Sequence, residues 1–522
     1  MDVDDAFRVL DSSGRQQWKH MLATMSQPLP GAFIILLMEF IGYTPNFECH
    51  RQGPNGTDIL VNACFNDTTA FCDDIVFRSG YTSVVTEWSL VCERTTDVHL
   101  LQSLFMAGMT IGAPLVSPLA DMFGRRRVVL LTFGLQALLV AALVFVPNYA
   151  TFAVLRFLAG VLQVGCLPCF TLSSELVGPQ YRSRVGLFGS TFFSIGIQML
   201  ALGAYVTTTW RLLVIASAAL AGLSVFVIWL FVPASPRWLM LNGRTEEAHK
   251  VMLGVARANG VTPPANFTLV AAREKTVGFP DNCCSLFRHW RSALWTVVLC
   301  LTWAVHTLTY YGLTAAAATM GQNRFISFAL SGLVEIPPNI VISWLLDKLG
   351  RRYTLSGVML AGGISCVLIF LLPGSYIDDQ GGRLTLSLIG KLCIATTFTV
   401  TYIFTGEIFP TSVRNTGFGI VNFCGRMAGI AYPFVALLNM VRKDLHFFVF
   451  GALITSSALL DLLLPETMGK PLPKTVGQIV GEEYAARTDR GEAGSETACF
   501  RLDVVKYAAF LLAMMAPGCG TS

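Results

Sequence analysis

Five ionisable residues lie inside long apolar stretches of this sequence, and their types could bind a charged solute. They are Glu39, Arg156, Glu335, Lys391 and Arg426. A charge at the middle of a membrane costs about 2.5–3.5 kcal/mol even on permissive scales, so each side chain needs an ionic partner or a wet surrounding. A guanidinium binds a carboxylate through two hydrogen bonds, and a carboxylate attracts an ammonium group. Arg426 with Glu335 would therefore suit a zwitterion. The alternative is that such charges pair with neighbours and hold helices together, which we favour for Arg156 and Lys391.

Aromatic and amide side chains in other apolar stretches could complete such a site. Trp303 and Tyr310 are seven residues apart and therefore share one helix face, and Tyr402 lies in a later stretch. Aromatic ring faces attract quaternary ammonium groups. Gln163 and Gln198 are polar residues within apolar stretches that could line the same cavity. The alternative for the aromatic residues is helix packing or an interfacial belt.

Acidic and basic residues recur at fixed spacing in the two halves of the chain. Asp121-Met-Phe-Gly-Arg125 returns as Asp347-Lys-Leu-Gly-Arg351, and both stand beside apolar stretches. A partly wet ion pair contributes only about 0–1 kcal/mol, so several pairs can break and reform. We predict a conformational latch formed by eight residues: Asp121, Arg125, Glu175, Arg182, Asp347, Arg351, Glu407 and Arg414. The alternative is that the basic residues only fix the topology.

A looser repeat follows in each half, at Pro233-Ala-Ser-Pro236 and at Pro465-Glu-Thr467. Two similar membrane-embedded halves around a central site are the layout of a secondary transporter. Gly108 and Gly112, and likewise Gly425 and Gly429, place small residues one helical turn apart. Such pairs allow close helix approach, so we expect them either to let the halves glide or to serve packing.

Composition restricts the class of protein. Apolar residues make up 53% of 522 residues and charged residues only 13%, whereas soluble domains carry about 25% charge. The sequence therefore indicates a polytopic membrane protein in a lipid bilayer, and the net charge of +4 gives no support for nucleic acid as a partner. A phosphate-binding loop, a metal-spaced His/Cys cluster and a nucleophile elbow are all absent from the sequence. We therefore expect no enzyme activity, no cofactor and no metal.

Twelve apolar stretches are long enough to cross a membrane, at about 20 residues each. They lie at 24–43, 98–120, 128–146, 150–173, 186–207, 211–232, 292–313, 326–346, 355–372, 385–408, 417–439 and 446–464. They predict an all-α protein with a short segment at 1–23, a first bundle at 24–232, a linker at 233–290, a second bundle at 291–465 and a tail at 466–522.

The distribution of Lys and Arg predicts the orientation. Clusters such as Arg125 to Arg127 follow the even-numbered stretches, which places both termini in the cytoplasm. The loop at 44–97 would then be extracellular, in keeping with its sequons at Asn55 and Asn66. The same loop carries four cysteines, which allow two disulfides in three pairings: Cys49, Cys64, Cys72 and Cys92. We expect a glycosylated, multi-pass protein of the plasma membrane.

The sequence resembles the major facilitator superfamily and, more narrowly, its organic cation, anion and zwitterion transporters, with the carnitine-type branch most similar. The narrower resemblance rests on the joint order of local strings: Glu87-Trp-Ser-Leu-Val-Cys92, Pro236-Arg-Trp-Leu239, Tyr310-Tyr-Gly312, Val334-Glu-Ile-Pro337, Thr405-Gly-Glu-Ile-Phe-Pro-Thr411 and Leu464-Pro-Glu-Thr467. It implies the major facilitator fold, with 12 transmembrane helices in two pseudo-symmetric six-helix bundles.

The resemblance also implies roles for single residues. The position of Arg426 is acidic in typical cation carriers and Arg in anion and carnitine-type carriers, and Glu335 resembles an acidic residue kept by cation and zwitterion carriers. Tyr402 matches carnitine-type relatives, and Trp303 and Tyr310 match cavity aromatics. Two departures stand out: Ala234 occupies a position that is Glu in the family, and the external loop has four cysteines where the family often has six.

These observations leave three functional hypotheses open. We expect an alternating-access carrier of small organic ions that favours zwitterions and organic cations such as carnitine-like compounds, with Na⁺ or H⁺ as a conceivable coupling ion. A second hypothesis is an organic anion carrier that uses Arg426 and Lys391. A third is a transporter-like receptor or scaffold without flux.

Overall fold

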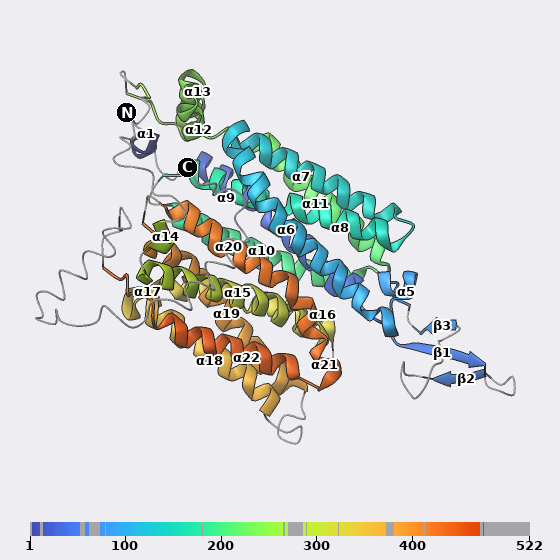
Figure 1. Ribbon diagram of the computed structural model, residues 1–522. Coiled ribbons are helices and arrows are strands. Elements are labelled where there is room, and N and C mark those ends of the chain that lie inside the picture. Colours follow the sequence, from blue (N-terminus) through green and yellow to red (C-terminus); the bar gives the residue numbers. More distant parts are fainter. Residues whose placement is uncertain are drawn as a thin grey trace, which may run out of the picture.

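The chain is almost entirely helical, and its long helices form two bundles that lie side by side (Figure 1). The computed structural model describes residues 3–10, 14–52, 58–61, 74–78, 80–178, 181–264, 267–269, 285–288, 290–321, 323–371, 380–410, 413–469 and 473. Long apolar stretches become helices because every backbone polar group in a membrane must be satisfied within its own segment.

Each bundle is built from consecutive parts of the chain. The first bundle contains α2 (Arg15–Met25), α3 (Pro28–Leu36), α4 (Met38–Ile41), α6 (Thr95–Phe123), α7 (Arg125–Ala142), α8 (Tyr149–Gln163), α9 (Cys166–Glu175), α10 (Arg182–Val206) and α11 (Trp210–Phe231). The second contains α15 (Trp290–Thr319), α16 (Arg324–Leu333), α17 (Ile336–Leu349), α18 (Arg351–Leu371), α19 (Gln380–Ile408), α20 (Arg414–Ala436), α21 (Leu438–Val441) and α22 (Leu445–Asp461). The short helices outside the bundles are α1 (Val3–Val9), α5 (Val84–Trp88), α12 (Pro236–Leu241), α13 (Thr245–Asn259) and α14 (Ser285–Arg288).

The helices account for the twelve predicted crossings. Among the described residues, ten helical segments are long and apolar enough to cross a membrane. The other two crossings are α16 with α17, the eighth along the chain, which is interrupted at Glu335 before Pro337 and Pro338, and the shorter α22, the twelfth along the chain. The first crossing begins at Arg15, earlier than the predicted residue 24. Its polar first turns depress the hydropathy signal, although Gln17 and His20 are buried there. Asn259 of α13 donates a hydrogen bond to the Gln17 side chain.

The loop between the first two crossings contains a small antiparallel sheet. Its strands are β1 (Phe47–Gln52), β2 (Asp58–Val61) and β3 (Asp74–Phe77), in the order β2-β1-β3. Cys92 is disulfide-bonded, which agrees with its predicted role. Outside the described residues lie two of the predicted disulfide cysteines and both sequon asparagines: Cys64, Cys72, Asn55 and Asn66.

The two ends of the molecule differ in how the bundles meet. We call the end that carries β1–β3 and α5 the loop end, and the end with the turns at Gly124 and Gly350 the latch end (Figure 1). α10 packs more extensively on α16, toward the loop end, than on α17. At the loop end Phe40 stacks on Phe325 with ring centroids 5.7 Å apart, and Arg324 lies 3.8 Å from the ring centroid of Tyr43. The loop end is thus closed by contacts between the bundles.

The repeated small residues pack helices within each bundle. A Cβ atom at Gly108 would lie 2.2 Å from the backbone oxygen of Phe157, and one at Gly112 would lie 2.4 Å from that of Val161. These contacts join α6 to α8. Gly425 approaches the backbone of Trp303 in the same way and so joins α20 to α15. A Cβ atom at Gly429 would lie 3.3 Å from Thr307 on α15 and 3.8 Å from the sulfur of Met106 on α6, in the other bundle. These glycines therefore serve packing, and a role in letting the two halves glide stays a prediction.

Candidate functional site

Glu335 sits at the break between α16 and α17, where its side chain is enclosed by three donors. Lys391 Nζ lies 2.9 Å from Glu335 Oε1, with exposed side-chain fractions of 1% and 7%. Tyr310 donates its hydroxyl to Oε1 at 2.9 Å, and Ser194 of the first bundle donates to Oε2 at 3.0 Å. Both carboxylate oxygens are therefore engaged by side chains from both bundles.

Lys391 is held as firmly as its partner. Its ammonium lies 3.2 Å from the ring centroid of Tyr310 and donates to the backbone oxygen of Tyr310 at 3.3 Å and to the hydroxyl of Thr314. A buried ion pair persists only when further hydrogen bonds satisfy the remaining donors and acceptors, as they do here. The structure therefore brings together three predicted site residues, Glu335, Lys391 and Tyr310, as one charge-balanced group.

Arg426, on α20, has a different environment. Its Nε donates to Asn422 Oδ1 at 2.7 Å, and its guanidinium bonds the thiol of Cys166 on α9 of the other bundle. Tyr311 and Tyr402 lie within its electrostatic reach. Among the described residues it makes no ion pair with a carboxylate, and it is only half-buried. The guanidinium is thus a cation at the boundary between the bundles whose charge a solute can balance.

Aromatic rings cluster beside this cation. Trp303 and Tyr402 meet edge to face with ring centroids 4.4 Å apart, and Phe398 lies 5.7 Å from Trp303 and 5.4 Å from Tyr402. Phe418 stacks on Tyr402 at 6.3 Å. We call Trp303, Phe398, Tyr402 and Phe418 the aromatic cluster. Tyr402 is the member of the cluster that exposes the largest fraction of its surface to the surroundings, 41%.

The remaining predicted polar residues take two kinds of position. Gln163 is buried and accepts a hydrogen bond from Gln136 at 2.6 Å inside the first bundle. Gln198 stands one helical turn after Ser194 on α10, and its buried amide nitrogen has no hydrogen-bond partner. Arg156 is buried and donates to Gln102 at 2.8 Å, which fits the structural role we favoured for it.

Glu39, on α4 of the first bundle, contacts the second bundle toward the loop end. Tyr432 on α20 donates its hydroxyl to Glu39 Oε1 at 3.4 Å. Nearby, Ser103 on α6 donates to the backbone oxygen of Ile430 on α20 at 2.7 Å. Glu39 therefore joins α4 to α20, at a residue of α20 that lies less than two helical turns from Arg426.

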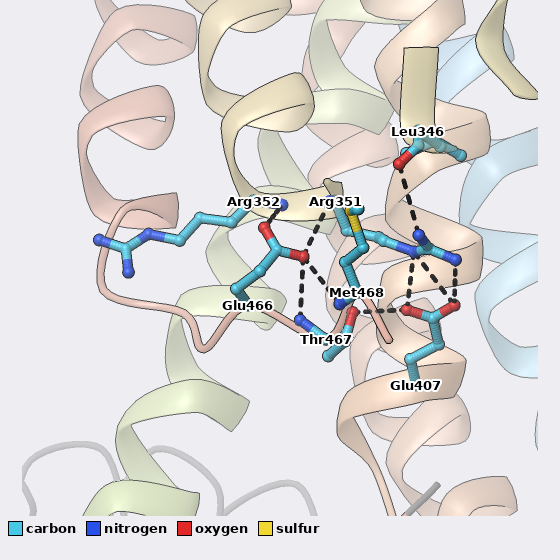
Figure 2. A network of polar contacts seen from close by, with 7 residues as sticks. All are labelled: Leu346, Arg351, Arg352, Glu407, Glu466, Thr467 and Met468. Atoms are coloured by element: carbon cyan, nitrogen blue, oxygen red, sulfur yellow. Dashed lines mark hydrogen bonds and ion pairs between the residues drawn. The ribbon is translucent and has the colours of Figure 1, made fainter. Parts of the chain in front are cut away.

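The latch of the second bundle joins three separate segments (Figure 2). Arg351 Nε donates to Glu407 Oε2 at 3.1 Å, and the hydroxyl of Thr467 donates to the same carboxylate. Glu466 accepts the backbone N–H groups of Arg351 and Arg352 at 3.0 Å each and so caps the start of α18. The loose repeat at Pro465-Glu-Thr467 thus contacts two of the predicted latch residues, Arg351 and Glu407. It was not among the predicted latch residues.

The latch of the first bundle has the same plan with one part missing. Arg125 Nη2 lies 3.2 Å from Asp121 Oδ1 and 3.4 Å from Glu175 Oε1. Ala234, however, stands where the second bundle has Glu466, and no side chain caps the start of α7. The departure noted in the sequence therefore removes a helix cap.

The contacts of the predicted latch residues lie within single bundles. For the other three predicted residues, the structure gives one contact or a place in a helix. Arg414 Nε donates to the backbone oxygen of Phe409 at 3.2 Å. Arg182 is the first residue of α10, as the repeat predicts. Asp347 lies on α17, but its side chain is outside the described residues.

Replacing Glu466 with Ala is expected to lower the free energy of unfolding by about 1 kcal/mol, the usual contribution of a helix cap. Burial raises the pKa of the Glu466 carboxyl, but the four backbone N–H groups that it accepts outweigh burial and hold the pKa below its ordinary 4.5. Because the folded-state pKa is lowered, this stabilisation is present above pH 4.5 and is lost as the pH falls below it. Thermal unfolding of the purified protein at neutral pH, and again under acid conditions, measures both effects.

Ala234→Glu is the matched control, because it supplies the missing carboxylate at the equivalent place in the first bundle. We expect it to raise the unfolding temperature at neutral pH. If Glu466→Ala were as stable as the unchanged protein at neutral pH, the capping role would be wrong.

The geometry and the comparisons agree on the class of protein. Two helical bundles that meet around charged and aromatic side chains define a membrane transporter. The Major Facilitator Superfamily model matches residues 85–433. Solute carrier family 22 member 15 of Xenopus tropicalis is 35% identical, over 94% of this chain and 93% of that protein. The human Organic cation/carnitine transporter 2 is 31% identical, over 76% of this chain and 72% of that protein. The human Solute carrier family 22 member 13 is 34% identical, over 76% of this chain and 71% of that protein.

The chain belongs to the major facilitator superfamily and, within it, to the solute carrier 22 family of organic ion transporters. It is a multi-pass membrane transporter rather than an enzyme. The fold agrees: the xylose transporter XylE from E. coli superposes with a TM-score of 0.59 over 87% of this chain and 99% of that structure, at 14% identity. At that identity the likeness concerns the fold alone.

Proposed function

We propose that this transporter carries small zwitterions that combine a carboxylate with a quaternary or alkylated ammonium, as carnitine-like compounds do. The observation that carries the proposal is Arg426, a half-buried guanidinium that makes no ion pair among the described residues and adjoins the aromatic cluster. A guanidinium binds a carboxylate bidentately, and ring faces attract the ammonium within about 6 Å. The human Organic cation/carnitine transporter 2, by its name, acts on this class of compound.

Glu335 supports a zwitterion over a simple cation. A cation without a carboxylate needs a free anionic partner, but both oxygens of Glu335 are engaged by Lys391, Tyr310 and Ser194. Lys391 neutralises the carboxylate, so this group offers little net attraction to an ammonium. The direct contact between Glu335 and substrate that the sequence suggested stays a prediction. We propose instead that the ammonium group of the substrate binds the aromatic cluster.

Alternating access is the proposed mechanism, with the bundles at 24–232 and 291–465 rocking about the central site. The loop end is closed by contacts between bundles, whereas each latch pairs residues of one bundle only. We propose that the latch end faces the cytoplasm, that both termini lie there, and that the protein resides in the plasma membrane. In this arrangement the present conformation is the one closed to the outside.

Uptake by cells expressing the chain tests the substrate class. The compounds are labelled carnitine, a dicarboxylate, and tetraethylammonium, with surface expression measured for each cell line. We expect carnitine to enter fastest and tetraethylammonium to enter no faster than in untransfected cells. Equal or faster entry of tetraethylammonium would contradict the proposed role of the carboxylate. The absence of flux for all three compounds in surface-expressed protein would favour a receptor or scaffold.

An organic anion carrier is the second candidate, and one observation favours it. Arg426 leaves an unbalanced positive charge at the bundle boundary, and the neutral Glu335–Lys391 pair does not offset it. The dicarboxylate in the same panel distinguishes the candidates, because an anion carrier gains nothing from the ammonium group of carnitine.

A further inference from the structure

Asp461, at the end of α22, is a buried carboxyl group behind the aromatic cluster. It exposes 0% of its surface, and its Oδ1 lies 2.6 Å from the hydroxyl of Thr302 on α15. Its other oxygen, Oδ2, is buried and has no hydrogen-bond partner. Thr302 is also fully buried, and Ser457 places a second hydroxyl 3.4 Å from that of Thr302. No ion pair compensates Asp461 among the described residues.

The single hydrogen bond at Asp461 Oδ1 suits a neutral carboxylic acid better than a carboxylate, because a carboxylate would need donors at both oxygens. The Thr302 hydroxyl carries one hydrogen but lies near two acceptors, Asp461 Oδ1 and the backbone oxygen of Val298 at 2.9 Å. If Oδ1 carries a proton, it donates to Thr302, and Thr302 donates onward to Val298. An ionised Asp461 would instead hold a full charge in the membrane interior on one hydroxyl donor, which is costly.

The other titratable groups of the neighbouring helices do not supply a counter-charge. α15, α18 and α21 pack on α22, and α21 contains no titratable residue. The groups on the other two helices and on α22 itself are Arg291, Cys300, His306, Tyr310 and Tyr311 of α15, Arg351, Arg352, Tyr353 and Cys366 of α18, and His446 of α22. None of them interacts electrostatically with Asp461, and within the described chain its one polar side-chain contact is Thr302.

His306 connects Asp461 to the proposed substrate site. Its Nδ1 lies 2.8 Å from the backbone oxygen of Thr302, and its Nε2 lies 2.9 Å from the Thr397 hydroxyl on α19. Its ring meets Phe398 of the aromatic cluster edge to face at 5.7 Å. Trp303, also of the cluster, follows Thr302 directly in the chain. A change of charge at Asp461 therefore acts on residues that touch the cluster.

We infer that Asp461 is a proton-binding site within the second bundle, and that its protonation is coupled to transport through Thr302 and His306. The step forms one O–H bond at Oδ1, and the proton comes from water when the bundle rearranges to expose the carboxylate. The coupling part of the inference rests on the proposed function, whereas the proton-binding part does not.

Infrared spectroscopy of the purified protein in lipid nanodiscs tests proton binding without any substrate. A protonated carboxyl gives a C=O band that carboxylates lack, so the spectrum of unchanged protein minus that of Asp461→Asn at neutral pH should contain one such band. Glu247→Gln, at an exposed carboxylate paired with Arg244, is the matched control and should leave the acid band in place. A spectrum of Asp461→Asn with the full acid band would overturn the inference. A band that disappears on adding Na⁺ would also overturn it, since the site would then hold a metal ion.

Proton coupling is then measured as uptake of carnitine against external pH. If one proton is bound in each cycle, uptake of the unchanged protein changes by up to about tenfold per pH unit over part of the range. Asp461→Asn mimics the neutral form permanently, so its uptake should lose that dependence while the protein remains folded and at the surface. An equally steep pH profile in Asp461→Asn would end the coupling claim. Because the infrared band needs no substrate, a failure of the proposed function leaves the proton site testable.

Discussion

Arg426→Ala is expected to reduce carnitine uptake at least about 30-fold at equal surface expression. Removing one partner of a desolvated charge pair costs about 2–5 kcal/mol, and 2 kcal/mol corresponds to about 30-fold. The loss arises because the substrate carboxylate is left without its guanidinium among apolar and aromatic side chains. Initial uptake rates below saturation, corrected for the protein at the cell surface, give the measurement.

Arg426→Lys is the informative companion variant. Lysine keeps the positive charge but lacks the planar fork that binds a carboxylate bidentately. We therefore expect it to recover part of the uptake lost in Arg426→Ala, with a weaker affinity than the unchanged protein. Wild-type uptake in Arg426→Ala would show that the substrate carboxylate does not meet this guanidinium.

Lys391→Met is expected to cause the largest loss of stability. The substitution leaves the Glu335 carboxylate buried with two hydroxyl donors and no counter-charge. Breaking a buried ion pair from one side costs about 3–5 kcal/mol. Thermal unfolding of the detergent-purified protein, followed by tryptophan fluorescence, should therefore show a much lower unfolding temperature.

The double variant Glu335→Gln with Lys391→Met separates the pair's structural role from substrate recognition. Glutamine can accept the Tyr310 hydroxyl through its oxygen and donate its amide N–H to the Ser194 hydroxyl, which then donates to the backbone oxygen of Ser190. No buried charge remains, so we expect most of the lost stability to return. Because we assign the ammonium to the aromatic cluster, the double variant should also transport carnitine. If the double variant were stable but did not transport carnitine, Glu335 would have to contact the substrate directly, contrary to our assignment.

The sequence predicted the fold well because its signals are local. Apolar length marks each crossing, and the duplicated turns need Gly at positive φ: Gly124 has φ of 93° and Gly350 has φ of 81°. The comparisons confirm the family and the fold class. The start of the first crossing at Arg15 was missed, because polar residues of α2 such as Gln17 and Thr24 are buried by tertiary contacts with α13 and α9.

The site was harder to predict because its contacts join distant helices. Glu335 and Lys391 lie on different helices, so no spacing in the sequence shows that their side chains meet. Asn422 was one turn from Arg426 and could have been noticed from helical periodicity. The proximity of Cys166 to Arg426 depends on how the bundles dock, which no spacing in the sequence shows. Asp461 stands near the end of the last apolar stretch, where a charge gives little signal.

The most direct test of the central claim compares carnitine with its methyl ester, which keeps the ammonium but lacks the carboxylate charge. Binding of both compounds is measured by calorimetry on the purified protein and on Arg426→Gln. We expect the unchanged protein to bind carnitine at least about tenfold more tightly than the ester, as about 1.4 kcal/mol of charge recognition requires. Arg426→Gln should bind the two compounds alike. If the variant kept the full preference for carnitine, Arg426 would not be the residue that recognises the carboxylate.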